Sequence, residues 1–150
     1  MSEAVIRLYG KAVKLETCGS YRRGRLTCGD VDILITRTDD KPVAGMLEPV
    51  LQLLEKEGFL KERLGNTRVS DRGSEMYMGV CKSKEDTFFR RIDIKVYPKE
   101  QYGFALLYFT GSDYFNRSMR LLAEQKGFTL SDHGLAPIGK VSGKKVSKGL

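Results

Sequence analysis

The stretch CGDVDILIT, residues 28–36, places two aspartates two positions apart in an otherwise apolar run. A short run rich in β-branched residues and preceded by glycine is typical of a β-strand. Side chains at i and i+2 of a strand point to one face, so Asp30 and Asp32 project together while Val31 and Ile33 point to the core. Two neighbouring carboxylates repel each other unless a cation lies between them or one is protonated. The stretch therefore predicts a strand with a charged site on one face.

A third carboxylate occurs in a similar setting further along the chain. FFRRIDIKVYP, residues 88–98, places Asp93 between Ile92 and Ile94. A pair of aspartates alone is usually a solvated strand face. If this second strand pairs beside residues 31–36, however, all three acids converge on one face, and hard divalent ions such as Mg²⁺ prefer such oxygen ligands. The third acid thus favours a metal site.

A glycine-serine turn with basic residues lies just before the first acidic strand. Gly19 and Ser20 offer backbone N–H groups and a hydroxyl that can hold a phosphate. Arg22, Arg23 and Arg25 follow within six residues of Gly19. In isolation they are a solvated basic turn, but beside a phosphate and a carboxylate cluster they would neutralise triphosphate charge.

The composition indicates an ordinary folded protein with a basic surface. The chain has 150 residues, 41% of them hydrophobic, and a net charge of +7, which favours a polyanionic partner such as nucleic acid. The three cysteines (Cys18, Cys28 and Cys81) form no CxxC pair, and we expect free thiols in a reducing compartment. No apolar run reaches membrane-spanning length, and residues 1–10 do not resemble a signal peptide, so we expect a soluble intracellular protein without a membrane partner.

The order of the expected elements is that of an α+β protein. We expect strands at residues 12–19, 31–36, 75–82 and 88–98, with a short hairpin loop between the last two. A helix should follow Glu48 and end at Gly58, because Leu47, Val50, Leu51 and Leu54 recur at helical spacing. Residues 138–150 read as the start of a strand-and-turn region, and a domain boundary is expected near residues 98–101.

A further helix is expected at residues 112–126. Ser112 or Asp113 would be its N-cap and Gly127 its stop. The residues before it, 108–112, are interpreted as an aromatic-glycine hinge. Helical spacing places two sets of side chains on separate faces: a polar face of Asp113, Asn116 and Arg120, and an apolar face suited to packing, made of Phe115, Met119 and Leu122.

Three motifs in this order resemble the palm and thumb signatures of family X DNA polymerases: CGSYRRGRLTCGDVDILIT, RRIDIKVYP and LLYFTGSDYFNRSMR. The resemblance extends from about Thr17 to about Gly139. It implies an α+β nucleotidyltransferase palm in residues 1–98, a mixed or antiparallel sheet with helices on one face. A small, truncated α/β thumb would follow in residues 99–150. On this resemblance, we expect no counterpart of the family's lyase and fingers domains in the chain.

The resemblance also implies functional residues, cofactors and partners. Asp30, Asp32 and Asp93 match the catalytic acids that hold two Mg²⁺ ions, for which Mn²⁺ can substitute. The implied partners are gapped or primer–template DNA and a dNTP, in a nuclear DNA-repair polymerase. The implied DNA-binding residues are Arg91, Arg117 and Arg120, and the implied nucleotide-binding residues are Gly19, Ser20, Arg23, Cys28, Gly29, Tyr108, Phe109, Gly111, Asp113 and Asn116.

Two other functions remain open. Template-independent terminal transferases of the same family carry a longer loop between the strands expected at 75–82 and 88–98, and the short loop here favours template-directed synthesis. A basic, folded segment without catalysis, which binds DNA through its charge alone, is the second alternative.

Overall fold

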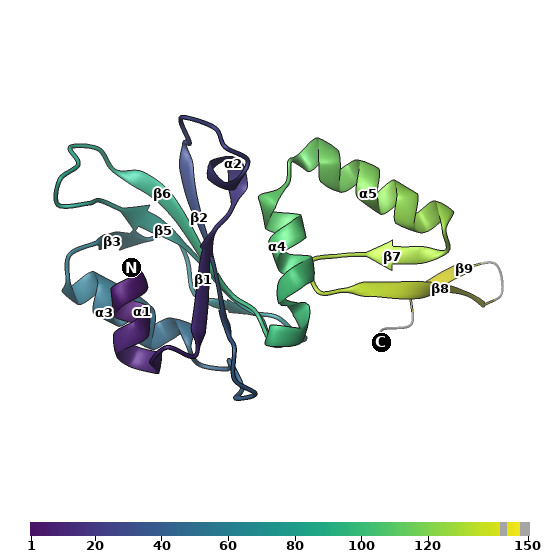
Figure 1. Cartoon of the computed structure of the whole chain (residues 1–150), viewed down its shortest axis with the longest axis horizontal. Coiled ribbons are helices and arrows are strands. Elements are labelled where there is room, and N and C mark those ends of the chain that lie inside the picture. Colours follow the sequence, from purple (N-terminus) through teal and green to yellow (C-terminus); the bar gives the residue numbers. More distant parts are fainter. Residues whose placement is uncertain (142–143, 148–150) are drawn as a thin grey trace.

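The computed structural model describes residues 1–141 and 144–147 and contains two β-sheets with a helix between them (Figure 1). The larger sheet has the strand order β1-β2-β6-β5-β3, and β4 pairs with β5. Strands β2 and β6 run parallel and the other pairs are antiparallel, so the mixed sheet of an α+β fold is confirmed. The strands are β1 (Val13–Thr17), β2 (Asp30–Arg37), β3 (Leu60–Arg63), β4 (Arg68–Val69), β5 (Glu75–Cys81) and β6 (Arg90–Val96).

Helices α1 (Ser2–Tyr9) and α3 (Leu47–Lys56) cover one face of this sheet and close the main core. The apolar face predicted for α3 is confirmed, because its four aliphatic residues are all at most 1% exposed. Helix α1 was not predicted; it packs Ala4 and Val5 onto the same core. From the sheet, Ile33, Ile35, Ile92 and Ile94 meet these helices.

Helix α4 (Tyr102–Thr110) packs against part of the opposite face. It follows a short 3-10 turn, η1 (Lys99–Gln101), and its Ala105 is buried against Leu34 and Tyr97. The interpretation of residues 108–112 as a hinge is wrong for residues 108–110, which form the last turn of α4. The reason is that YGFALLYFT is apolar all round, and such a helix lacks the periodicity by which amphipathic helices are recognised.

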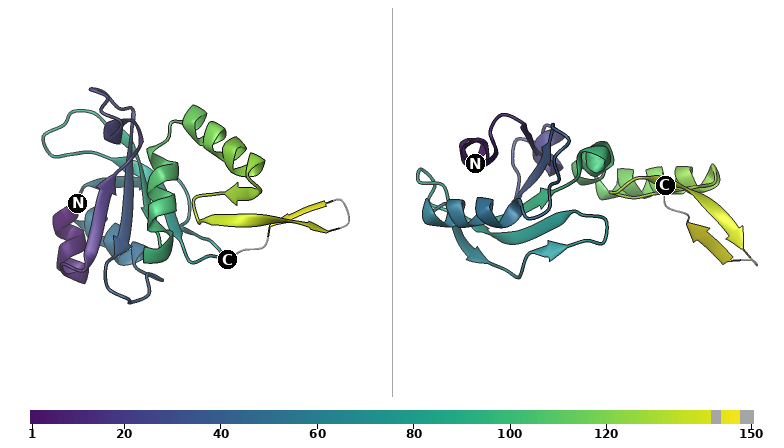
Figure 2. Two further views of the ribbon diagram at one scale, coloured as in Figure 1. Left: turned by 45° about the vertical axis from the view of Figure 1, so that its right-hand side comes forward. Right: turned by 90° about the horizontal axis from the view of Figure 1, so that it is seen from below.

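The remaining residues form a smaller α/β unit on the far side of α4 (Figure 2). Helix α5 (Asp113–Gln125) lies against β7 (Phe128–Leu130), which pairs antiparallel with β8 (Leu135–Val141). Strand β9 (Lys144–Ser147) completes the sheet, so the strands of the expected strand-and-turn tail are confirmed. Residues 142–143 and 148–150, on which the rest of that prediction falls, lie outside the described residues.

Helix α5 confirms one prediction from the sequence and corrects another. Its N-cap is Ser112, whose hydroxyl accepts a hydrogen bond from the Phe115 N–H at 3.3 Å. The apolar packing face, in contrast, is wrong for Phe115 and Leu122, which are 40% and 44% exposed. The buried residue of the helix is Asn116, a member of the expected polar face.

The cysteines are free thiols, as expected: Cys18 and Cys81 are buried and Cys28 is half-buried. Among the described residues, no helix has the length and apolar character needed to cross a membrane.

Candidate active site

The parallel pairing of β2 with β6 places the predicted acids side by side. Asp32 is the register partner of Asp93, and Asp30 is the partner of Arg91. Partners in neighbouring strands share a face, so the three aspartates lie on the side of the sheet away from α1 and α3. On the other side, Ile33 is part of the core and Val31 packs against it, as predicted.

Two of the three carboxylates are paired with cations from β6. The ammonium group of Lys95 lies 3.0 Å from Asp32 Oδ1, and the Arg91 guanidinium lies 3.3 Å from Asp93 Oδ1. Lys95 is 5% exposed, so the ion pair with Asp32 is largely shielded from water, whereas Asp30 is exposed. The positive charges of Lys95 and Arg91 compensate Asp32 and Asp93, which explains how the two strands tolerate neighbouring acids. In this conformation no three acidic, His or Cys side chains of the described residues come together as a metal site.

Gly19 brings the turn after β1 onto the carboxylate of Asp32. Its φ angle is +63°, and a Cβ at this position would lie 2.6 Å from Asp32 Oδ2. The Cys18 N–H donates to the Asp32 carbonyl at 2.8 Å, which fixes the start of helix α2 (Gly19–Arg22) beside β2. Any side chain at position 19 would therefore strain the backbone and displace Asp32.

A cleft of about 580 Å³ opens beside this turn, between α2, the start of β2 and the junction of α4 with α5. Eleven of the predicted functional residues line it: Gly19, Ser20, Arg23, Gly29, Asp30, Asp32, Tyr108, Phe109, Gly111, Asp113 and Asn116. Ser112 and Tyr114 line it as well and were not predicted. Figure 1 shows α2 and the junction of α4 with α5 facing each other across the upper part of the molecule.

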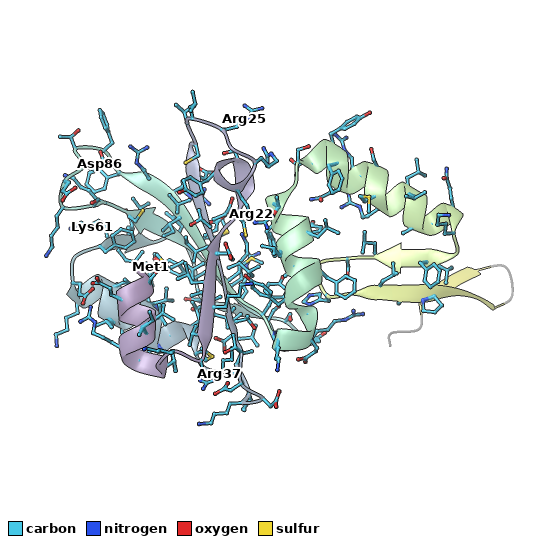
Figure 3. The ribbon with its side chains drawn as sticks, in the orientation of Figure 1. Met1, Arg22, Arg25, Arg37, Lys61 and Asp86 are labelled. Atoms are coloured by element: carbon cyan, nitrogen blue, oxygen red, sulfur yellow. The ribbon has the colours of Figure 1, made fainter. Side chains whose placement is uncertain are left out.

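Hydrogen bonds join the end of α2 and the residue after it to the end of α4, beside the cleft. Arg23 Nη1 donates to the Thr110 carbonyl at 2.7 Å, and Arg22 Nη1 donates to the Thr110 hydroxyl at 3.2 Å. Figure 3 places Arg22 at this contact between the two parts of the molecule. Since the last carbonyls of a helix are negatively polarised, the two cations also stabilise the carboxyl end of α4.

Aromatic side chains lie next to the Lys95–Asp32 ion pair. The Lys95 ammonium lies 4.2 Å from the centre of the Phe109 ring, which makes an edge contact with Tyr108 at 5.1 Å between ring centres. Phe109 thus covers the Lys95–Asp32 pair and lowers its contact with water. Lys95 was missed by sequence reasoning, although its place two residues after Asp93 puts it on the acidic face.

Five predicted residues lie outside the lining of the cleft. Asp93 and Arg91 are on the adjacent strand, and Cys28 immediately precedes Gly29. On α5, Arg117 is exposed, and Arg120 lines a separate small pocket together with Asn116 and Tyr108. The Asn116 amide donates to the Tyr108 carbonyl at 2.7 Å and thereby joins α5 to α4.

Two buried groups near the cleft are held in their neutral forms. Burial raises the pKa of Cys18 to about 11, although the nearby Lys95 opposes the shift. Burial, and then the carboxylate of Asp132, also raises the pKa of Tyr97. The Tyr97 hydroxyl donates to Asp132, and this bond joins the end of the large sheet to the segment after β7.

Comparisons with known proteins agree on one family. The family model described as DNA polymerase beta palm matches residues 2–99, and the model described as DNA polymerase beta thumb matches residues 105–149. DNA polymerase lambda of Rattus norvegicus is 45% identical over 135 residues, which are 88% of this chain and 23% of the relative. DNA polymerase lambda of Arabidopsis thaliana is 44% identical over 123 residues, 79% of this chain and 23% of that protein.

A solved structure supports the same relationship. The crystal structure of Leishmania infantum polymerase beta in a ternary gap complex superposes with a TM-score of 0.81 at 31% identity, and the match covers 92% of this chain and 47% of that one. The chain therefore spans about a quarter of the length of the curated relatives and about half of the solved one.

Proposed function

The chain belongs to the family of DNA polymerases that share the polymerase beta palm and thumb, and from this premise we propose that it carries out template-directed, gap-filling DNA synthesis. The reaction is nucleotidyl transfer from a dNTP to a primer 3′-hydroxyl. The observation that carries the proposal is the pairing of Asp32 with Asp93 on parallel strands, beside a cleft that also contains Gly19, Ser20 and Arg23.

The three aspartates fit a magnesium site by their chemistry. Asp30, Asp32 and Asp93 offer carboxylate oxygens on one face, which are the ligands preferred by Mg²⁺ and accepted by Mn²⁺. When bound, a pair of such ions would lower the pKa of the primer hydroxyl and neutralise charge on the leaving pyrophosphate. An ion bound there would compete with Lys95 for Asp32 and with Arg91 for Asp93.

The residues of the chain have distinct tasks in the transfer. Asp93 accepts the proton of the primer 3′-hydroxyl; the 3′-oxygen forms a bond to the α-phosphorus, and the bond from that phosphorus to the bridging oxygen breaks to release pyrophosphate. Arg23 and the Gly19-Ser20 turn hold the triphosphate. Tyr108 and Phe109 pack against the sugar of the incoming nucleotide, as the resemblance implies.

Three arginines are the residues proposed to contact DNA. Arg91 lies on the acidic face of the sheet, and Arg117 and Arg120 lie three residues apart on α5. The guanidinium groups would contact backbone phosphates, so binding of DNA should be independent of base sequence.

A single-nucleotide incorporation assay tests the proposal. Wild-type chain, Asp93→Asn and the matched control Asp40→Asn are incubated with gapped DNA, Mg²⁺ and one labelled dNTP. Asp40 is remote from the cleft and its side chain is 96% exposed. We expect incorporation that follows the template base and is retained in Asp40→Asn but abolished in Asp93→Asn. Full activity of Asp93→Asn would exclude its role as the base, and incorporation without a template would favour a terminal transferase.

One observation favours a non-catalytic segment as the second candidate. Lys95 and Arg91 already neutralise Asp32 and Asp93, and a DNA-binding segment needs no further cation there. Salt-sensitive binding of DNA without incorporation by the wild-type chain would support this candidate.

The proposal includes a role in DNA repair and a location in the nucleus. The similarity to DNA polymerase lambda, and to a polymerase beta solved in a gap complex, supports the repair role. Fluorescence microscopy of the tagged full-length protein tests the location.

A further inference from the structure

The tip of the β5–β6 hairpin exposes two consecutive phenylalanines. This tip comprises residues 82–89 between the two strands, and in it Phe88 is 68% exposed and Phe89 is 63% exposed. An aromatic ring is a large apolar surface that is normally buried, so a neighbouring pair left in water needs an explanation. Figure 3 places Asp86 of this tip beyond the ends of the sheet strands, away from the thumb.

Hydrogen bonds order the hairpin tip around Asp86. Its carboxylate accepts from the Phe88 N–H at 3.1 Å and from Arg90 Nε at 3.0 Å, and these contacts lower the pKa of Asp86. Its own N–H donates to the Ser83 carbonyl at 3.2 Å. The backbone that carries the two rings is therefore fixed before any partner arrives, which reduces the entropy lost on binding.

The exposed rings lie on a tip that carries two lysines. Arg90 is held by Asp86 at 3.0 Å and Arg91 by Asp93 at 3.3 Å, so Lys82 and Lys84 are the cations of the tip that remain for a phosphate. The Lys82 ammonium is 5.1 Å from the centre of the Phe89 ring, so a cation already sits against that aromatic side chain. Exposed aromatic rings beside basic groups are the combination that binds single-stranded nucleic acids: bases stack on the rings, and the cations attract the phosphates.

The hairpin tip lies at the acidic end of the sheet. The register partner of Asp30 is Arg91, and Asp93 follows Arg90 by three residues, or roughly 10 Å along an extended strand. A nucleic acid strand that reaches the face of Asp93 can thus extend to the tip within a few nucleotides.

We propose that the hairpin tip is a binding site for single-stranded nucleic acid, in which Phe88 and Phe89 stack on one or two unpaired bases. This function goes beyond nucleotidyl transfer, because stacking requires neither the metal nor the dNTP. The Lys82 ammonium beside the Phe89 ring, with Lys84 two residues away, favours a polyanion over an apolar protein surface.

The experiment measures binding of a fluorescently labelled oligothymidylate by anisotropy, in EDTA and without dNTP. The double variant Phe88→Ala/Phe89→Ala should bind at least about fivefold more weakly, since base–aromatic stacking is a substantial part of single-strand affinity. The dependence of affinity on salt should stay unchanged, because the rings contact no phosphate. Phe128→Ala, a partly exposed aromatic on β7, is the matched control and should bind like the wild type.

A second variant separates stacking from simple apolar contact. Phe88→Leu/Phe89→Leu keeps an apolar surface without π-faces and should bind as weakly as the alanine variant, while blunt duplex DNA should bind all variants equally. Wild-type affinity in the alanine variant, full binding by the leucine variant, or an equal loss for duplex DNA would each overturn the proposal. The test contains no metal or dNTP, so its result is independent of whether the chain is a polymerase.

Discussion

Replacement of Lys95 by methionine should lower stability without metal and raise the affinity for Mg²⁺. In the structure, the Lys95 ammonium lies 3.0 Å from Asp32 Oδ1. A metal at Asp32 would compete with this internal cation, whereas methionine has a side chain of similar length and removes the competing charge. The variant therefore separates the structural role of the ion pair from the metal-binding role of the carboxylate.

The size of the effect follows from the burial of the pair. The side chains of Lys95 and Asp32 are 7% and 27% exposed, so the carboxylate is left partly desolvated when its partner is removed. A hydrogen bond to a charged group stabilises a protein by about 1.5–3 kcal/mol, and we expect a loss of about 2 kcal/mol in EDTA. At about 2–4 °C per kcal/mol for a protein of this size, Tm should fall by about 4–8 °C. Release of the same interaction should strengthen Mg²⁺ binding by up to about 30-fold.

Thermal unfolding in EDTA and isothermal titration with Mg²⁺ measure the two quantities. Lys99→Met is the control, because Lys99 forms a comparable pair with Asp40 at 3.1 Å whose side chains are 54% and 96% exposed. Such a surface pair contributes at most about 1 kcal/mol, and its loss should leave Mg²⁺ affinity unchanged. Unchanged or weaker Mg²⁺ binding by Lys95→Met would refute the view that the Lys95 ammonium competes with a metal ion for Asp32.

Three further predictions concern stability and DNA binding. Glu75 is 5% exposed and accepts a hydrogen bond from the Leu47 N–H at the start of α3 at 2.9 Å. Glu75→Ala should therefore lower the free energy of unfolding, measured by urea titration, by about 3 kcal/mol. A change below about 1 kcal/mol would contradict this capping role. Burial raises the pKa of Cys18 in the folded protein to about 11 from an ordinary value near 9, so the neutral thiol stabilises the folded protein below pH 9 and this contribution is lost as pH rises towards 11. Cys18→Ala should therefore flatten the alkaline loss of stability in a pH series of melting curves. An identical pH profile in the variant would exclude the thiol as the source of that loss. Arg117→Ala and Arg120→Ala should each weaken DNA binding for all sequences and reduce the slope of log K against log salt by about 0.9 if the residue meets a phosphate, and sequence-dependent losses would argue against such contacts.

The elements with a strong periodic pattern were predictable from the sequence. Strand β2 has an alternating β-branched run, and helix α3 places four aliphatic residues at helical spacing. Helix α5 carries the Ser112 N-cap, which the structure confirms. Elements without such signals were missed: α1 has eight residues and no side-chain cap, and β3 is a short strand whose last three residues are exposed.

Helix α4 and the cations of the site depend on tertiary structure. Residues 102–110 lie between two sheets, and their apolar side chains are not confined to one face, so the sequence lacks the periodic pattern that predicts an amphipathic helix. Convergence of the three aspartates was expected only on the condition that the two strands pair, and the parallel register of Asp32 with Asp93 was not predicted. Lys95 looked like an ordinary strand residue, and its contact with Asp32 follows from that register and from the cover of Phe109. Local sequence patterns therefore predicted the three acidic residues, whereas the cations that compensate their charge became evident only from the packing of the strands.

Titration of Mn²⁺ followed by electron paramagnetic resonance tests most directly whether Asp30, Asp32 and Asp93 form one metal site. The signal of free Mn²⁺ is lost on binding, and the measurement needs no turnover. With a dNTP present, we predict that Asp93→Asn and Asp32→Asn weaken Mn²⁺ binding by at least about tenfold, since even residues that only orient metal ligands contribute this much. Asp40→Asn should bind as the wild type does. Wild-type affinity in Asp93→Asn would contradict a shared site and, with it, the assignment of this face of the sheet to nucleotidyl transfer.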